Sequence, residues 1–458
     1  MSRNVRNMLA LTLVVVMLLA IVPISSAQDR VQITWFVGLG TGTNNEQIDA
    51  QNQVVADFNA SQDKIELVIN IAGSNQTAPD VLATLIASGQ APDIVGPVGF
   101  AGANQFAGEW LDLTSLVEQS GYDLAQFPEN LVDAYRSLDG NELLGLPFAI
   151  YPGVLYYNVD LFDEAGLNYP PTEPDVNYVM PDGSEVPWDY NTVVEIGKIL
   201  TVDANGNDAT MAEFDPTNIV QYGFIHQWDT IRSDFHTFGA NYVVDEEGQV
   251  HIWDNWRAEA QWLWDSIWTS HINPTDSVIS SDLLNGNAFA SGRIAMARSM
   301  LWYTCCLGDM TSNWDLAVQP AYEGTIYAPI DMDNFRIQKD TAHPEEAFTV
   351  LQYLLSDGAP SLLSTYGAYP ALPALQDPYI QTQSEKYPSV QNWDVVTTSI
   401  PLAPNPHHES WYPNFNKGQV RFSDFRTLLG SDGGGDIDLP AELDRLQSDL
   451  QAIVDEVP

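Results

Sequence analysis

The most constraining feature of this sequence is the regular alternation of strand-like and helix-like segments that begins near residue 31. The segment "VQITWFVG" is β-branched and aromatic and predicts a strand, and "EQIDAQNQVVADFNAS" then carries Ile48, Val54 and Phe58 at helical spacing. The segments "KIELVINIAG", "APDVLATLIASGQ" and "APDIVGPV" predict a strand, a helix and a further strand. This βαβαβ order indicates an α/β fold with mostly parallel sheets flanked by helices.

The first 27 residues predict a secretory signal peptide. Arg3 and Arg6 precede an apolar run too short to cross a bilayer comfortably, and Ser-Ser-Ala at 25–27 supplies small residues for cleavage. An uncleaved membrane anchor is the alternative. No cysteine lies near the cleavage point, so we expect a periplasmic or extracellular protein that is not a lipoprotein.

The remaining chain of about 430 residues exceeds the size of a single core and predicts two domains. Removing residues 1–27 takes away two arginines and no acidic residues, so the net charge moves from −44 to −46. Because so acidic a surface repels phosphates, we expect no nucleic-acid partner.

Two loops resemble known binding motifs only in part. "GLGTG" at 38–42 lacks both the Lys-Ser/Thr of a Walker loop and GxGxxG spacing, so it does not predict a nucleotide site. It follows the first strand, where Thr41 and Gly42 are candidate ligand contacts. "DANGND" at 203–208 approaches a calcium loop, but Asp208 and Phe214 occupy the positions that need Gly and Glu, which favours a hairpin turn.

Residues for catalysis or for a cofactor are not evident. The histidines are scattered apart from the pair at 407–408, no GxSxG motif is present, and the chain has two cysteines, which are adjacent. We therefore predict no catalytic residues, no metal and no cofactor.

Tryptophans in polar segments indicate the kind of ligand. Trp228, Trp302 and Trp411 lie in "HQWDT", "MLWYT" and "ESWYPN". Indole and phenol faces stack on the C–H faces of sugar rings, while Asp, Asn and Thr bond the hydroxyls. Together these residues predict a carbohydrate cleft.

Five segments resemble one protein family in the same order along the chain. They are "GQAPDIVG", "LPFAIYPGVLYYNVDLFDEAGLNYPPT", "NAFASGRIAMARSMLW", "WDLAVQPAYEGT" and "HPEEAFTVLQYLLS". They are similar to the extracellular solute-binding proteins of ABC sugar importers, the group of maltose-binding protein. The resemblance implies a monomeric binding protein, not an enzyme, that captures a sugar or oligosaccharide and delivers it to a membrane permease.

The resemblance also implies the periplasmic-binding-protein fold, in which two lobes joined by three hinge crossings close on a ligand. We expect crossings near 147–152, 318–321 and 362–366. Lobe 1 is then residues 28–148 and 319–363, and lobe 2 is residues 149–318 and 364–458.

Carried over by position, the resemblance implies a set of ligand-binding residues. Trp302, with Tyr303, falls where the family stacks a sugar ring, Trp411 is the second stacking residue, and Tyr151 lies at the hinge. A strand end in lobe 1 supplies the remaining residues, which are Asp331, Asp333 and Asn334. The segment "VGPVGF" and an insertion at 170–188 depart from the family, so the exact sugar does not transfer.

Two questions stay open at this stage. Cys305 and Cys306 form either a strained vicinal disulfide or two buried free thiols, because neighbouring Cα atoms lie about 3.8 Å apart, closer than a normal bridge requires. The alternative functions are a binding protein for a cationic ligand such as a polyamine and a secreted carbohydrate-active enzyme.

Overall fold

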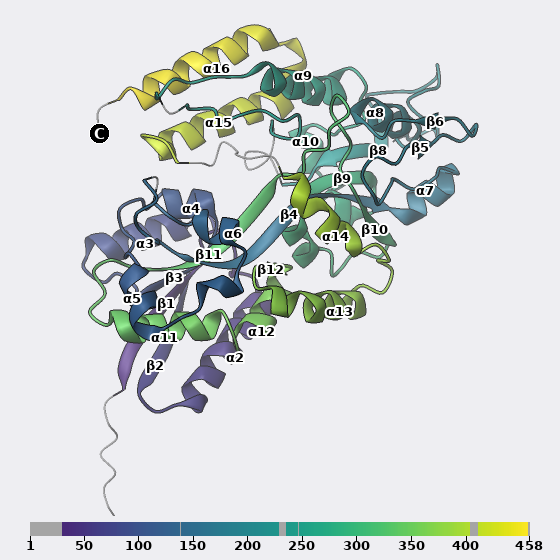
Figure 1. Ribbon diagram of the computed structural model, residues 1–458. Helices are drawn as coiled ribbons and strands as arrows, with labels where there is room; N and C mark the ends of the chain where they lie inside the picture. The colour runs from purple at the N-terminus through teal and green to yellow at the C-terminus, as the bar shows by residue number, and fades with distance from the viewer. Residues whose placement is uncertain (1–29, 138, 229–234, 246, 404–410, 457–458) are drawn as a thin grey trace, which may run out of the picture.

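The structure, a computed structural model, describes residues 30–137, 139–228, 235–245, 247–403 and 411–456. The predicted signal peptide lies outside these residues. Figure 1 shows two groups of helices and strands on either side of long central strands. We call the group around β1 lobe 1 and the group around β8 lobe 2.

Lobe 1 begins with the predicted βαβαβ order. Strands β1 (Val31–Val37), β2 (Ile65–Ile71) and β3 (Ile94–Val98) are parallel, which confirms the predicted α/β class. Asn44 caps α2 (Asn45–Ser61) by accepting a hydrogen bond from the Gln47 amide. The other helices of this lobe are α3 (Ala78–Ala87), α4 (Phe100–Asn104), α5 (Thr114–Ser120), α6 (Glu129–Asp133), α11 (Pro344–Leu354) and α12 (Ala359–Tyr366).

The long strand β4 (Leu146–Asn158) joins the lobes, and all of its 13 residues are buried. Its first half pairs antiparallel with β11 (Ile330–Ile337) and β12 (Tyr369–Pro370). Its second half pairs antiparallel with β9 (Ile294–Met300) and β10 (Trp314–Ala317). The main sheet therefore runs through both lobes in the order β2-β1-β3-β11-β4-β9-β8-β7.

Lobe 2 continues this sheet. Strand β8 (Ile219–His226) is parallel to β9, and β7 (Val202–Asp203) is antiparallel to β8. The helices are α7 (Val159–Ala165), α8 (Tyr190–Ile199), α9 (Asp254–Trp268), α10 (Asp276–Ile279), α13 (Gln376–Lys386), α14 (Asp394–Ser399), α15 (Phe415–Gly430) and α16 (Leu439–Val454).

Hydrophobic packing divides the molecule into a main core along the sheet and smaller clusters. One of these clusters joins α9, α15 and α16, which lie together at the top of Figure 1. Ala101 of α4 in lobe 1 packs against it, so this cluster contacts both lobes. The predicted crossings fall on β4, after β10 and on α12, and the lobe boundaries remain predictions.

The two irregular segments form hairpins. Residues 170–188 contain β5 (Tyr178–Val179) and β6 (Glu185–Val186), which pair antiparallel. Residues 203–208 form a tight turn in which the Asp203 carboxylate accepts hydrogen bonds from the amides of Asn205, Asn207 and Asp215. Burial acts to raise the pKa of Asp203, but these hydrogen bonds dominate and hold it well below its ordinary value.

Among the residues that the structure describes, no cluster of three or more His, Cys, Asp or Glu side chains could hold a metal ion. Within the same residues, none of the helices combines the length and the hydropathy of a membrane span.

Candidate functional site

A cavity of about 420 Å³ lies where the two lobes meet. Its lining comes from loops after β1, β2, β3 and β8, from the central strands β4 and β11, and from two short segments beside them. These two segments are the 3₁₀ helix η3 (Leu301–Cys306) and the end of α12. These loops follow the carboxyl ends of the parallel strands β1 and β3, where ligands bind in open α/β sheets.

The lobe 1 face of the cavity carries hydroxyls and amides. We call this face the polar wall; its side chains are those of Thr41, Thr43, Asn44, Gln47, Asn75 and Gln105. The Gln47 side chain accepts a hydrogen bond from the Gly42 amide at 2.9 Å and donates one to the Thr41 hydroxyl at 3.2 Å. The Thr43 hydroxyl donates to the Asn75 side-chain oxygen at 3.0 Å. Several of these polar groups are therefore already oriented by one another.

Gly42 shapes this wall through its backbone. It has a φ of 93°, and a Cβ placed on it would lie 2.1 Å from Cγ1 of Val37. Only glycine fits this turn. Gly42 is buried behind the wall and is not among the residues that line the cavity, contrary to the contact expected from its loop position.

A second part of the lining carries aromatic rings and carboxylates, which we call the aromatic wall; its members are Tyr151, Trp228, Trp302, Asp331 and Asp333. The Trp302 indole N–H donates to Oδ2 of Asp331 at 3.0 Å. The Tyr151 hydroxyl donates to Oδ2 of Asp333 at 2.9 Å. Asp331 and Asp333 are two residues apart on β11, so both point to the same side of the strand.

Burial raises the pKa of Tyr151 well above its ordinary value, and the neighbouring Asp333 carboxylate adds to the effect. The phenol therefore remains a protonated donor across the physiological range. The wall thus combines ring faces with fixed hydrogen-bonding groups, which suits a ligand with apolar faces and polar edges.

The rings of Trp228 and Tyr303 pack against each other in a T-shaped arrangement. Trp228 is 40% exposed, and its indole N–H donates to the Gly286 carbonyl at 3.1 Å. Its ring meets the edge of the Tyr303 ring at 5.3 Å. Tyr303 is fully buried behind Trp228, with its hydroxyl bonded to Asn287, so it does not line the cavity as expected.

Two further expected residues lie outside the lining. Asn334 is buried, where its side chain donates to the Val98 carbonyl and accepts from Arg336. Trp411 is 40% exposed and is not among the lining residues. The preceding residues 404–410 lie outside the described part of the chain.

Both cysteines line the cavity beside Trp302, and their sulfurs are not joined. The interaction between the neighbouring thiols raises the pKa of Cys305 and lowers that of Cys306. The two thiols are separate in this structure, and both side chains are partly exposed.

Tyr366 is a lining residue that the sequence did not reveal as a ligand contact. It is buried at the end of α12, and its hydroxyl has no hydrogen-bond partner within the residues that the structure describes. Burial raises the pKa of Tyr366, so its proton is retained. A hydroxyl in this position can donate to a molecule in the cavity.

A buried ion pair joins α9 to β9, the strand that leads into η3. Arg298 on β9 lies 3.3 Å from the Glu259 carboxylate on α9, and both side chains are fully buried. The Thr237 hydroxyl accepts from Arg298 and donates to Glu259. Since β9 leads directly into η3, this network fixes the strand from which Trp302 extends.

Comparison with known proteins gives one family. The bacterial extracellular solute-binding proteins match residues 53–392. Curated relatives include the sn-glycerol-3-phosphate-binding periplasmic protein UgpB of Brucella abortus, 30% identical over 159 residues, and that of Rhizobium meliloti, 31% identical over 160 residues. These matches cover 33% of this chain and 36% and 35% of the relatives, so the chain spans about a third of their length.

Solved structures resemble the whole chain in fold. The Listeria monocytogenes substrate-binding protein Lmo0181, in complex with cycloalternan, has a TM-score of 0.73 at 20% identity, covering 93% of this chain and 99% of that one. UgpB from Mycobacterium tuberculosis, in complex with glycerophosphocholine, has a TM-score of 0.69 at 15% identity, covering 93% and 98%. Maltose-bound T. maritima MalE3 has a TM-score of 0.68 at 19% identity, covering 92% and 99%.

Proposed function

The chain belongs to the bacterial extracellular solute-binding proteins, and from this premise we propose that it captures a sugar or short oligosaccharide in the cavity between its lobes. It is a binding protein and not an enzyme, as its family is. In this proposal the monomeric protein is exported by residues 1–27 and delivers its ligand to the permease of an ABC importer.

The observation that carries the proposal is the pairing of rings with carboxylates on the aromatic wall. Trp302 and Tyr151 each hold a carboxylate beside a ring, at 3.0 Å and 2.9 Å. A sugar ring needs an apolar surface for its C–H face and fixed acceptors for its hydroxyls. The polar wall adds amides and hydroxyls from lobe 1, while Trp228 and Trp302 follow the lobe 2 strands β8 and β9, so a ligand would contact both lobes and favour their closure.

A second candidate is a cationic ligand such as a polyamine. The aromatic wall contains two carboxylates, and the described lining residues include no Lys, Arg or His. An ammonium group would gain from both Asp331 and Asp333 and from nearby ring faces. A simple phosphate ester would find no cationic side chain among these residues.

A thermal-shift screen of residues 28–458 tests the proposal. The ligands are mono- and oligosaccharides, polyamines, sn-glycerol 3-phosphate and glycerophosphocholine, with amino acids as controls. A ligand at 100 times its Kd should stabilise the protein by about 2.7 kcal/mol. Stabilisation by one sugar class supports the proposal, whereas stabilisation only by polyamines or by phosphate esters contradicts it.

Product analysis after long incubation addresses the remaining alternative. A binding protein leaves an oligosaccharide intact. Release of shorter sugars would contradict the proposed function and favour a carbohydrate-active enzyme.

A further inference from the structure

Cys305 and Cys306 have no part in the proposed ligand contacts, yet both line the same cavity as Trp302. They are the two cysteines of the whole sequence, they are adjacent, and they end η3. Both are partly exposed, so a reagent in the cavity can reach them. We propose that they are a thiol–disulfide pair whose oxidation to a vicinal disulfide reshapes the cavity wall that carries Trp302.

The surroundings of η3 make this pair sensitive to geometry. The Tyr387 hydroxyl donates to the Thr304 carbonyl at 2.6 Å, and the Asn287 side chain donates to the Cys306 carbonyl at 3.0 Å. A Cβ on Gly367 would lie 2.3 Å from the Thr304 hydroxyl oxygen and 3.1 Å from the Cys305 amide. The segment is thus packed closely against lobe 2 and against the end of α12.

A disulfide between neighbouring residues does not fit an undistorted backbone. Bridged cysteines normally have Cα atoms about 4.4–6.8 Å apart, whereas neighbours across a trans peptide lie about 3.8 Å apart. Formation of the bond must therefore change the last turn of η3. Since Trp302 belongs to the same short helix and contacts Asp331, the change reaches the aromatic wall.

The two thiols have different roles in the reaction. The interaction with Cys305 lowers the pKa of Cys306, and the Lys386 ammonium lowers it further. Lys386 also lies 3.3 Å from Glu46 of α2, so these two charges are near the pair. Cys306 is accordingly the attacking thiolate, and Cys305 is the thiol that completes the bond.

The oxidant is an external disulfide, either a small molecule or an extracytoplasmic protein. The Cys306 thiolate attacks one of its sulfurs, forms a mixed disulfide and releases the first thiol. Cys305 loses its proton and attacks the Cys306 sulfur, which releases the second thiol. Two S–H bonds are lost, one S–S bond forms, and the external disulfide is reduced to two thiols.

This inference rests on the proposed function in one respect: the reshaped wall matters biologically because the cavity holds the ligand. If ligand affinity differs between the reduced and oxidised forms, the ligand must shift the thiol–disulfide equilibrium by the same factor. The chemical step itself does not depend on which ligand binds.

The first test uses the full chain in mixtures of reduced and oxidised glutathione. Intact mass, free-thiol titration and tryptophan fluorescence are measured together. We expect the loss of two hydrogen atoms without added glutathione, the loss of both thiols, and a fluorescence change that a reductant reverses. Addition of glutathione without ring closure, or an internal disulfide with unchanged fluorescence, would overturn the inference.

Matched variants identify the residues that produce the mass and fluorescence changes. Cys305→Ser and Cys306→Ser each retain one thiol and should take up one glutathione without forming an internal bond. The double variant should show no redox response, and Trp302→Phe should lose most of the fluorescence change. A full fluorescence response in Trp302→Phe would contradict the reshaping of this wall.

Titration with maltotriose and spermidine then measures affinity in both redox states. At least a threefold difference in Kd for a probe that binds supports the inference, and equal Kd values count against it. If neither probe binds in either state, the mass and fluorescence results alone decide the redox inference, and the thermal-shift screen decides the ligand class.

Discussion

The two walls of the cavity differ in what holds their side chains in place. On the polar wall, Gln47 and Asn75 bond to neighbouring groups of the same loops. On the aromatic wall, Trp302 and Tyr151 donate hydrogen bonds to the carboxylates of β11, a central strand of the main sheet. The polar wall is therefore a local structure, whereas the aromatic wall depends on the core behind it.

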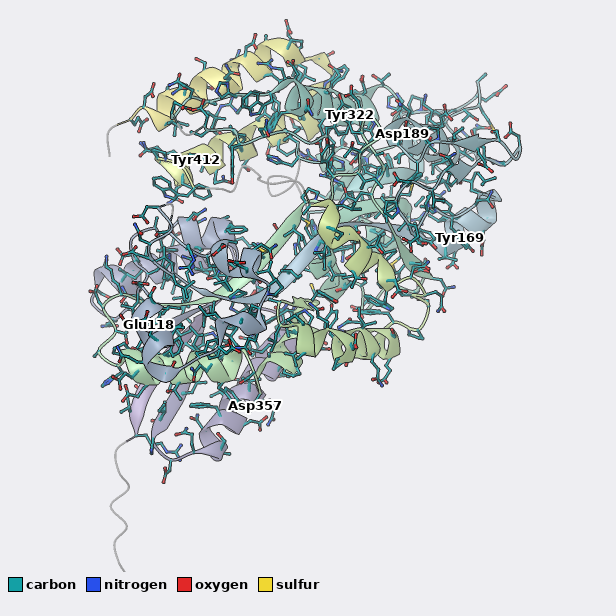
Figure 2. All side chains as sticks on the ribbon, in the orientation of Figure 1. Glu118, Tyr169, Asp189, Tyr322, Asp357 and Tyr412 are labelled. Atoms are coloured by element: carbon teal, nitrogen blue, oxygen red, sulfur yellow. The ribbon has the colours of Figure 1, made fainter. Side chains whose placement is uncertain are left out.

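This difference predicts different responses to substitution. A change behind the aromatic wall should cost the stability of the whole protein, while a change in the polar wall should act on one loop. Figure 2 shows that other side chains, such as Glu118 on lobe 1 and Tyr169 on lobe 2, lie far from where the lobes meet. Four predictions, which use five substitutions and their controls, test this comparison of the two walls.

The largest effect is expected from Glu259→Ala, which removes the carboxylate that pairs with the buried Arg298 guanidinium. Removing one partner of a buried pair costs about 3–5 kcal/mol. Denaturant unfolding measures this loss of unfolding free energy. Glu109→Ala, which breaks a partly exposed pair with Lys339, is the control and should cost about 1 kcal/mol or less. Equal losses in the two variants would remove the distinction between walls.

Trp302→Ala should give the next largest effect, this time on binding. Loss of a stacking surface of this size weakens ligand binding by about 2 kcal/mol, or roughly thirtyfold in Kd. Calorimetric titration with the ligand from the screen measures the change. Trp411→Ala, outside the lining, should bind as the wild type does, and a comparable loss there would place a ligand contact beyond the described cavity.

Gln47→Ala tests the polar wall. The variant leaves the Gly42 amide and the Thr41 hydroxyl without their partner, at a cost of about 1–2 kcal/mol. Hydrogen exchange of the loop after β1 should accelerate more than exchange in the central strands. Gln53→Ala, exposed on the same helix, is the matched control. A uniform increase across the protein would argue against a locally supported wall.

The smallest effects are expected from Asp331→Asn and Asp333→Asn if the ligand is neutral. Asn keeps one oxygen acceptor, so a hydroxyl of a sugar loses only about 1 kcal/mol. An ammonium ligand would lose about 1.5–3 kcal/mol with the charge. The ratio of these losses to that of Trp302→Ala, measured by the same titration, decides between the two ligand classes.

Much of the aromatic wall could be predicted from sequence. Trp302, Tyr151, Asp331 and Asp333 lie in segments with recognisable patterns, and all four line the cavity. Asn334 does not line it, because β11 is irregular between Asp333 and Asn334 and the Asn334 side chain is bonded to the Val98 carbonyl and to Arg336. Tyr303 follows Trp302 in a 3₁₀ helix, where successive side chains point in different directions.

The polar wall could not be predicted in the same way. Gln47 lies in the first turn of α2, and Asn75 lies between β2 and α3, so each has the appearance of an ordinary surface residue. Their place in the cavity lining depends on three loops meeting in space, which the order of the elements predicts but residue type does not. The position of Tyr366 in the lining could not be predicted for a related reason, since an aromatic residue at helical spacing usually belongs to the core.

Strand β4 has a consequence for how the protein folds. Its first half completes the hydrogen bonding of the lobe 1 sheet, and its second half does the same for lobe 2. A lobe expressed alone would therefore expose an unpaired strand edge prone to aggregation. We therefore expect the two lobes to unfold as one unit, because each sheet contains part of the same strand β4.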